Sequence, residues 1–263
     1  MNRMEIKFYK YQGTGNDFVI LDNRDGGYST ITEEQVQFLC DRKFGIGADG
    51  LMLLETIEGF DFRMKYFNAD GKEGSMCGNG GRCLVQFAKD MGISHSHYHF
   101  LAVDGPHEAE FDSKGLVRLK MQDVNAINLD GADKVLDTGS PHYIRFMDDL
   151  NHLDVFTEGR KIRYNNQYRE KGINVNFVFR DNDGIRVRTY ERGVENETLS
   201  CGTGVTASAI AASDGMGQQH VFINVEGGKL EVAFNRIDEQ HCNNIWLIGP
   251  ATFVFSGKIS LAL

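Results

Sequence analysis

The feature that most limits the possible folds of this chain is a pattern that occurs twice, half a chain apart. Residues 62–68 lead to the motif Cys-Gly-Asn-Gly that starts at Cys77, and residues 185–191 lead in the same way to Cys-Gly-Thr-Gly starting at Cys201. Each copy is typical of a strand, a short polar loop and a helix that begins at the cysteine. The sequence therefore predicts a duplicated unit in which each copy supplies one thiol.

The repeat continues beyond the two cysteines. Apolar residues at helical spacing predict helices over 77–92 and 201–215, each ending at a glycine. A hairpin is then expected in each half, within 100–111 around an Asp-Gly turn and within 222–234 around a Glu-Gly-Gly turn. Small residues on nearly every face of the second helix suit a helix that strands enclose.

The predicted fold class is α+β, with two similar domains. Residues 1–124 would form the first domain and residues 125–251 the second, and the last strand, 252–263, would join the first domain. One further helix is expected at about 33–43, where a threonine and a glutamine have the spacing of a capping box.

Charge and composition exclude several classes of partner. The chain has 28 basic and 37 acidic residues and a pI near 5.4, so it offers no electrostatic surface for nucleic acid or for an anionic membrane. A small-molecule partner is therefore expected. The segment Met1–Lys7 lacks an apolar signal core, and no stretch approaches the ~20 apolar residues of a membrane span, so we expect a cytoplasmic protein. A homodimer is the working expectation for its assembly.

Five cysteines, an odd number in a chain large enough to fold without disulfides, predict reduced thiols. No pair has the two-residue spacing of a zinc knuckle. We interpret Cys40, Cys83 and Cys242 as small buried hydrophobic residues.

A second possible metal site lies at His95, His97 and His99, which alternate so that they could share one strand face. Nothing comparable recurs in the second half of the chain. We therefore interpret these histidines as a polar strand edge and expect no metal.

Cys77 and Cys201 are the candidate reactive residues. A cysteine at a helix N-terminus faces unpaired backbone N–H groups and the positive end of the helix dipole, which can lower its pKa from ~8.5 into the range ~3.5 to 7.5. The glycines that follow leave the amides open to bind a carboxylate. Two such thiols on opposite sides of an α-carbon would invert it, because one removes the proton and the other replaces it.

Six short motifs follow one another along most of the chain. They are Gly13-Thr14-Gly15-Asn16-Asp17-Phe18, Asn68-Ala69-Asp70-Gly71, Met76-Cys77-Gly78-Asn79-Gly80, Gly139-Ser140-Pro141-His142, Glu191-Arg192-Gly193 and Cys201-Gly202-Thr203-Gly204. Together they resemble the diaminopimelate epimerase family. The resemblance implies interconversion of LL- and meso-diaminopimelate, in lysine and peptidoglycan precursor biosynthesis, without pyridoxal phosphate, another cofactor or a metal.

The resemblance also implies a role for individual residues. Cys77 and Cys201 would be the acid/base thiols, and His142 and Glu191 would help to set their protonation. The family's fold has two similar domains, each with strands wrapped round a central helix, and its site lies in the cleft between them. The implied substrate contacts are Asn16, Asn68, Gly78, Asn79, Asn174, Glu191, Arg192, Gly202 and Thr203.

Among these substrate contacts, Arg192 is also supported by its chemistry, and Asn174 has an alternative. Arg192 supplies the planar cation that the distal carboxylate of a substrate with two amino-acid ends would need. Asn176 is the neighbouring candidate for the role of Asn174. The chain also departs from the family pattern at Ser140, where asparagine is frequent, and at Gly50, where glutamine is frequent, so direct contacts at those two positions are in doubt.

Two other functions remain open from the sequence. One is another cofactor-independent racemase, acting on proline or hydroxyproline; the polar set of Asn68, Asn174 and Arg192 favours a substrate with a second charged end instead. The other is a redox or amino-acid-binding protein in which the two cysteines of the repeat form a switchable disulfide.

Overall fold

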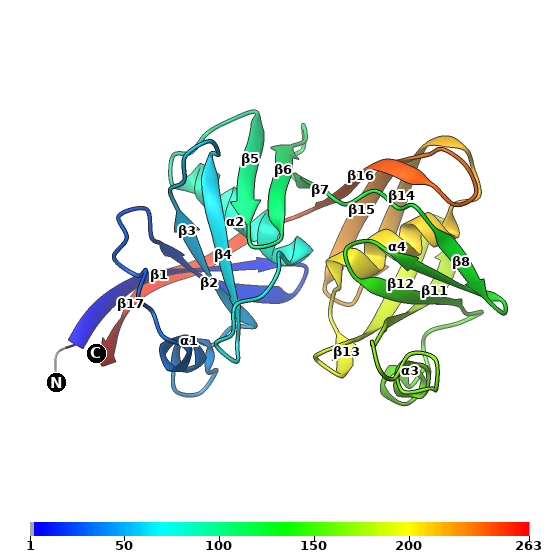
Figure 1. Cartoon of the computed structure of the whole chain (residues 1–263), viewed down its shortest axis with the longest axis horizontal. Coiled ribbons are helices and arrows are strands. Elements are labelled where there is room, and N and C mark those ends of the chain that lie inside the picture. Colours follow the sequence, from blue (N-terminus) through cyan, green and yellow to red (C-terminus); the bar gives the residue numbers. More distant parts are fainter. Residues whose placement is uncertain (1–2, 263) are drawn as a thin grey trace. The chain divides into compact units, whose positions relative to one another are not determined.

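The computed structural model describes residues 3–262 of the chain (Figure 1). Its contacts divide the chain into two compact units. The first extends to Leu119 and includes the segment from Pro250 onward, and the second runs from Lys120 to Gly249.

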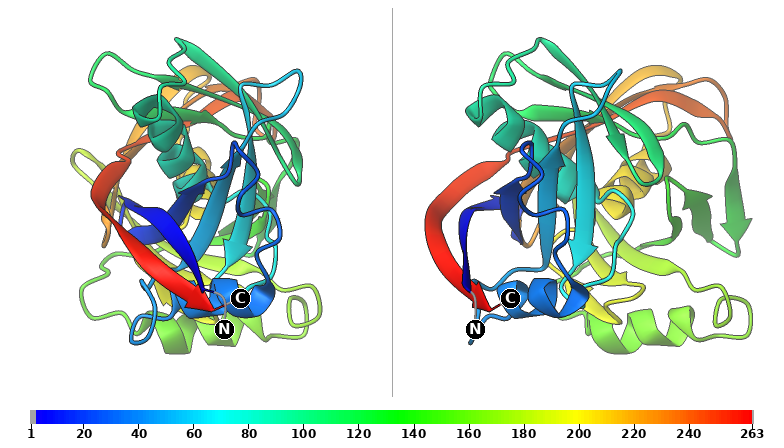
Figure 2. Two further views of the ribbon diagram at one scale, coloured as in Figure 1. Left: turned by 90° about the vertical axis from the view of Figure 1, so that its left-hand side faces the viewer. Right: turned by 60° about the vertical axis from the view of Figure 1, so that its left-hand side comes forward.

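The first unit is built from strands with two helices. Its strands are β1 (Arg3–Gly13), β2 (Asn16–Asp22), β3 (Gly50–Glu55), β4 (Phe62–Asn68), β5 (His97–Ala102), β6 (Gly105–Phe111), β7 (Val117–Lys120) and β17 (Thr252–Ala262). Its helices are α1 (Glu33–Cys40) and α2 (Gly78–Asp90). The strands β1 and β17, from opposite ends of the sequence, pair in antiparallel fashion and appear as the adjoining blue and red arrows of Figure 2.

The second unit is also built from strands with two helices. Its strands are β8 (Ile127–Asp130), β9 (Asp133–Asp137), β10 (Pro141–Phe146), β11 (Asn174–Asp181), β12 (Gly184–Glu191), β13 (Asn196–Thr198), β14 (Gly217–Val225), β15 (Gly228–Arg236) and β16 (Cys242–Gly249). Its helices are α3 (Val155–Arg163) and α4 (Gly202–Ala212).

The two units share one order of strand pairing. In the first, β1 and β2 are antiparallel, β2 and β3 parallel, β3 and β4 antiparallel, β4 and β5 parallel, and β5 and β6 antiparallel. The series β9, β10, β11, β12, β14, β15 repeats these five pairings in the same order. The predicted α+β class and the duplication behind it are confirmed.

The two helices that follow the cysteines occupy the same place in this order. Helix α2 lies between β4 and β5 in the chain, α4 lies between β12 and β14, and each has the cysteine as its N-cap. Helix α4 is buried along almost its whole length and contacts strands β9, β10, β11, β12, β14, β15 and β16. The expectation that strands enclose it is confirmed. It ends at Ala212, before the predicted Gly215, because Ser213 already has an extended backbone.

Of the two remaining helices, α1 was predicted from the sequence and α3 was not. Helix α1 begins with the expected capping box, in which the Thr32 hydroxyl accepts from the Gln35 amide and the Gln35 side chain accepts from the Thr32 amide. Helix α3 was not predicted; it begins after Asp154, whose carboxylate accepts from the Thr157 amide. Among the described residues, no helix is long and apolar enough to cross a bilayer.

Candidate active site

The first cysteine lies at the start of α2, within hydrogen-bonding distance of an asparagine. The backbone of Cys77 is extended, so its side chain stands at the open end of the helix. Its Sγ lies 3.6 Å from Oδ1 of Asn16, and Nδ2 of Asn79 donates to the same oxygen at 3.4 Å. We call Cys77, Asn16 and Asn79 the Cys77 group. The structure thus brings together three residues predicted from the sequence.

A charged cluster holds Asn16 in place. Its Nδ2 donates to Oδ2 of Asp49 at 2.6 Å. Arg42 bridges Asp49 and Asp17, and Lys10 forms an ion pair of 2.7 Å with Asp17. Burial would raise the pKa of Asp17, but hydrogen bonds from Arg42 and Lys10 outweigh it and lower the pKa to about 2. The Asp17 carboxylate therefore stays charged at neutral pH, and the ion pairs of Asp17 and Asp49 with Arg42 anchor the loop that carries Asn16.

Asn68 ends strand β4 and is exposed to solvent. The strand beside it explains one departure from the family pattern. A Cβ at Gly50 would lie 2.6 Å from both the Phe67 carbonyl oxygen and the Tyr66 ring. Tyr66 thus occupies the space that a side chain at position 50 would need.

The second cysteine also lies at a helix start, and it is buried. Cys201 is extended in backbone and 7% exposed. Its Sγ lies 3.6 Å from Oγ1 of Thr203, and that hydroxyl lies 2.9 Å from Nε2 of His142. The sequence placed all three residues in the site, and the structure brings them into one hydrogen-bonded series.

His142 is held on its other side by two buried strand residues. Its Nδ1 lies 3.0 Å from Nδ2 of Asn176, and Oδ1 of Asn176 accepts from the Thr189 hydroxyl at 2.9 Å. Nδ2 of Asn176 also donates to the Tyr143 carbonyl at 3.2 Å, which fixes the direction of the amide. We call Cys201, Thr203, His142, Asn176 and Thr189 the Cys201 group.

These contacts determine where the His142 proton lies. An amide nitrogen can only donate, so Nδ1 accepts from Asn176 and the ring proton is on Nε2, directed at Thr203. Burial, with a smaller contribution from the charge of Arg192, lowers the pKa of His142 to about 3. The ring is therefore neutral at physiological pH.

Three further residues of the second unit form a neighbouring polar group. Nδ2 of Asn174 donates to Oγ of Ser140 at 2.9 Å, and its Oδ1 accepts from the backbone amide of Arg192 at 2.8 Å. The Arg192 guanidinium donates to Ser140 at 3.3 Å and to the Lys171 carbonyl at 3.2 Å. Asn174 therefore positions Arg192, whose side chain is exposed.

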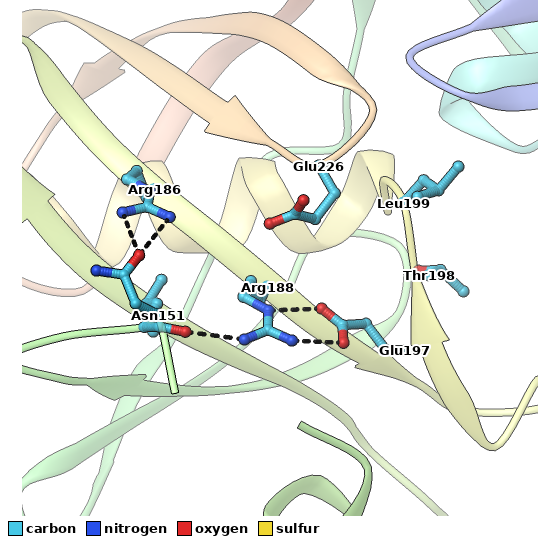
Figure 3. A pocket seen from close by; sticks show the side chains of 8 residues that line it. Asn151, Arg186, Arg188, Glu197, Thr198, Leu199 and Glu226 are labelled. Atoms are coloured by element: carbon cyan, nitrogen blue, oxygen red, sulfur yellow. Dashed lines mark hydrogen bonds and ion pairs between the residues drawn. The ribbon is translucent and has the colours of Figure 1, made fainter. Parts of the chain in front are cut away.

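Glu191 ends strand β12, partly exposed, and its Oε2 accepts from the Thr198 hydroxyl at 2.8 Å. Thr198 also lines a pocket of about 470 Å³ in the second unit (Figure 3). In that pocket Arg188 forms a two-pronged ion pair with Glu197, and Arg186 donates to Asn151. The polar side chains lining the pocket thus bind largely to one another, and Cys201 is not among them.

Sequence reasoning missed three residues that support the two groups. Thr189 and Asp49 escaped notice, and Asn176 was considered only as a substrate contact. One signal was present for Asn176: a buried polar residue between Val175 and Phe177 must be hydrogen-bonded.

None of the five cysteines, all of which lie within the described residues, is in a disulfide bond. Within residues 3–262 no group of three or more His, Cys, Asp or Glu side chains is arranged to hold a metal ion.

Comparisons with known proteins support one family. The sequence model of the family described as diaminopimelate epimerase matches residues 8–127 and 134–254. The chain is 49% identical to a diaminopimelate epimerase of Flavobacterium psychrophilum over 97% of this chain and 100% of that one. It is 46% identical to one of Chlorobaculum tepidum, over 95% and 99% of the two chains.

Solved structures with little sequence identity share the fold. A hydroxyproline epimerase from Agrobacterium vitis matches with a TM-score of 0.72 and 13% identity, covering 99% of this chain and 93% of that one. A PhzF-family phenazine biosynthesis protein of Bacillus anthracis matches with a TM-score of 0.70 and 15% identity, over 99% and 100%. The family match and the close relatives span both units, so this chain belongs to the diaminopimelate epimerase family.

Proposed function

We propose that this chain interconverts LL- and meso-diaminopimelate, with Cys77 and Cys201 as the two acid/base groups. The observation that carries the proposal is the matched placement of the two cysteines, each the N-cap of the helix that occupies the same position in its unit. The relatives at 49% and 46% identity, named diaminopimelate epimerase, support the substrate.

The reaction needs a base on one side of the α-carbon and an acid on the other. One cysteine, as thiolate, takes the α-proton and becomes a thiol; the other, as thiol, gives its proton to the opposite face and becomes a thiolate. Backbone amides at the two helix starts, including those of Gly78 and Gly202, would bind the α-carboxylate and stabilise the negative charge that develops on it.

The residues beside each cysteine would tune this exchange. Thr203 can donate to a Cys201 thiolate or accept from a Cys201 thiol, since a hydroxyl does both. The neutral His142 keeps that hydroxyl oriented. In the Cys77 group, Asn16 and Asn79 would contact the sulfur and the substrate. Glu191, at the end of β12, is the remaining proposed proton-setting group.

The distal end of the substrate would bind Arg192. Its guanidinium is exposed, is held by Ser140 and Lys171, and presents a planar cation suited to a carboxylate. Asn68 would add a polar contact. We further propose that the enzyme acts as a homodimer in the cytoplasm, where its thiols would stay reduced. Sedimentation analysis of the purified chain tests the assembly.

The substrate assignment is tested with an arginine variant. We expect conversion of LL-diaminopimelate by the purified chain without added cofactor, and no conversion of proline or hydroxyproline. Arg192→Met should raise KM for diaminopimelate by roughly ten- to a hundredfold, because a charged hydrogen bond contributes about 1.5–3 kcal/mol. Arg186→Met, on the strand β12 that precedes Arg192, is the matched control and should leave KM unchanged. Turnover of proline but not of diaminopimelate would refute the assignment.

A further inference from the structure

Asn176, in the Cys201 group, is a buried amide with only one possible orientation. It lies on β11 and is 0% exposed. Its Nδ2 donates to the Tyr143 carbonyl at 3.2 Å, and its Oδ1 accepts from the Thr189 hydroxyl at 2.9 Å. A carbonyl oxygen can only accept, so the two ends of the amide cannot be exchanged. The Asn176 nitrogen therefore faces Nδ1 of His142, at 3.0 Å, as a donor.

This hydrogen bond sets the direction of the next two. With Nδ1 as an acceptor, the neutral ring of His142 carries its proton on Nε2 and donates it to Oγ1 of Thr203 at 2.9 Å. The Thr203 hydroxyl can then direct its own proton at Sγ of Cys201, 3.6 Å away. A sulfur that accepts a hydrogen bond is favoured in its thiolate form. The Cys201 group therefore favours a thiolate.

The hydrogen bond at Cys77 has the opposite direction. Nδ2 of Asn16 donates to Asp49 at 2.6 Å, so its Oδ1 faces Sγ of Cys77 at 3.6 Å. Asn79 gives the same orientation, because its Oδ1 accepts from Arg82 at 3.1 Å and its Nδ2 donates to Oδ1 of Asn16 at 3.4 Å. An amide oxygen cannot donate, so the sulfur must donate to it. The Cys77 group therefore favours a thiol.

The charged and titratable groups beside Cys77 agree with a thiol there. Asp49, which binds the Cys77 group, and Asp104, which accepts from the backbone amide before Cys77 at 3.3 Å, both oppose a second negative charge. Arg82 is a buried cation, but its hydrogen bond to the Cys77 group fixes an oxygen toward the sulfur. Cys83 is neutral, because burial raises the pKa of its thiol to about 12.

Two charged side chains lie near the Cys201 group. The charge of Arg192 contributes to lowering the pKa of His142, so this cation acts on the group. Glu191 follows Thr189 by two residues on β12 and accepts from the Thr198 hydroxyl at 2.8 Å. These two charges have opposite signs. Each cysteine also stands at the N-terminus of its helix, so the helix dipole favours an anion at both. The direction of the hydrogen bonds is what distinguishes the two sulfurs.

We propose that Asn176 is a positioning residue for proton transfer: through His142, it makes Thr203 donate to the neighbouring sulfur. Cys201 is thereby held as the thiolate of the resting enzyme, and Cys77, whose sulfur donates to an amide oxygen, is the resting thiol. The proposal rests on the proposed acid/base role of the two cysteines.

The first test is ¹⁵N NMR of histidine-labelled protein at pH 7, with His142→Gln to assign the ring signals. In the wild-type chain, His142 should have its proton on Nε2 and an unprotonated Nδ1. Asn176→Leu, which is similar in size, removes the donor to Nδ1, and a population with the proton on Nδ1 should appear. Thr203→Val should keep the wild-type tautomer, because Asn176 is still present.

The second test is the pH dependence of alkylation by iodoacetamide, followed for each cysteine peptide by mass spectrometry and scaled to its own maximal rate. In the wild-type chain, Cys201 should have a lower midpoint than Cys77. Asn176→Leu and Thr203→Val should each raise the Cys201 midpoint by about one pH unit, a tenfold loss of rate below it, and Thr203→Ser should retain the wild-type midpoint. Asn23→Leu, which removes a buried, hydrogen-bonded asparagine from the first unit, is the control and should move neither midpoint.

Four results would overturn the proposal. Two concern the wild-type chain: a His142 proton on Nδ1, or a lower alkylation midpoint for Cys77 than for Cys201. The others are an unchanged Cys201 midpoint in folded Asn176→Leu, and equal midpoints in Thr203→Ser and Thr203→Val. The first two need no variant, so the proposal stays testable if Asn176→Leu fails to fold. Neither measurement uses substrate, so these outcomes are separate from whether diaminopimelate is converted.

Discussion

At the scale of single residues, the Cys201 group shows how a buried histidine can orient a hydroxyl beside a cysteine without carrying charge. Asn176 can only donate to Nδ1, so the ring must donate from Nε2 to Thr203. Thr203 in turn contacts the sulfur of Cys201. These hydrogen bonds let His142 orient the Thr203 hydroxyl beside Cys201. Because burial lowers its pKa to about 3, His142 stays neutral throughout the physiological range.

This arrangement predicts how stability depends on pH. The folded-state pKa of His142, about 3, lies below the ordinary value of 6.5, so between these pH values the unfolded chain binds the extra proton. Acid therefore favours unfolding. Relative to His142→Gln, the wild-type chain should lose roughly 2 kcal/mol of unfolding free energy between pH 7.5 and pH 5.

Urea unfolding at a series of pH values measures this difference. His152→Gln, at an exposed histidine, is the control, and its difference from wild type should stay constant over the same range. A constant difference for His142→Gln as well would contradict a neutral, buried His142.

At the scale of elements, the matched helices α2 and α4 differ in how tightly their first turns are packed. Each has a glycine three residues after its cysteine, Gly80 in α2 and Gly204 in α4. A Cβ at Gly204 would lie 2.5 Å from Oδ1 of Asn176, which its hydrogen bonds hold in place. A Cβ at Gly80 would meet the flexible Met52 sulfur at 3.3 Å. The glycine of α4 is thus required by packing, and that of α2 much less so.

Alanine at the two matched glycines should therefore have unequal effects. Gly204→Ala should lower the free energy of unfolding by about 1–3 kcal/mol, because it forces Asn176 from its place. Gly80→Ala should change it by less than about 1 kcal/mol, since the helix preference for alanine offsets a mild contact. Denaturant unfolding of both variants checks this; equal losses would show that the Asn176 contact is not what excludes a side chain.

Much of the element order was predictable because it depends on local signals. Short stretches of sequence determine the capping box of α1, the two hairpin turns and the start of α2 and α4 at the cysteines. Helix α3 was missed although Val155, Gly159 and Ile162 are buried at helical spacing. Gly159, near the centre of the helix, lowers its helix propensity. A glycine is needed there because a Cβ would lie 2.4 Å from Cβ of Tyr190 on β12, and this contact between distant segments is not visible in the local sequence.

The site was predictable only where a motif marks it. Cys201, His142 and Thr203 belong to such motifs. Asn176 and Thr189 are opposite each other in the pairing of β11 with β12, and strand register is not visible in a single sequence. The same applies to Arg82, whose burial depends on segments as distant as Thr14 and Pro250.

At the scale of the whole molecule, one chain contains two versions of the same unit and each version contributes one cysteine. Both units carry the same series of strand pairings and place a helix with a cysteine N-cap at the same point in it. The surrounding side chains differ: the first unit has a buried arginine and a charged cluster, and the second a neutral histidine, threonine and asparagine. The duplicated unit thus provides two cysteines, and the residues around them differ between the two copies.

Deuterium incorporation tests most directly whether two thiols share one proton transfer. LL-diaminopimelate is incubated in D₂O with the wild-type chain, Cys77→Ala and Cys201→Ala, and followed by proton NMR. If both thiols act, newly formed meso isomer should carry deuterium at one α-carbon while remaining LL substrate keeps its protons. Both variants should lose conversion by at least ~10²–10⁴-fold. A variant that converts the substrate as fast as the wild-type chain would contradict the two-thiol mechanism. So would a product that retains the original proton.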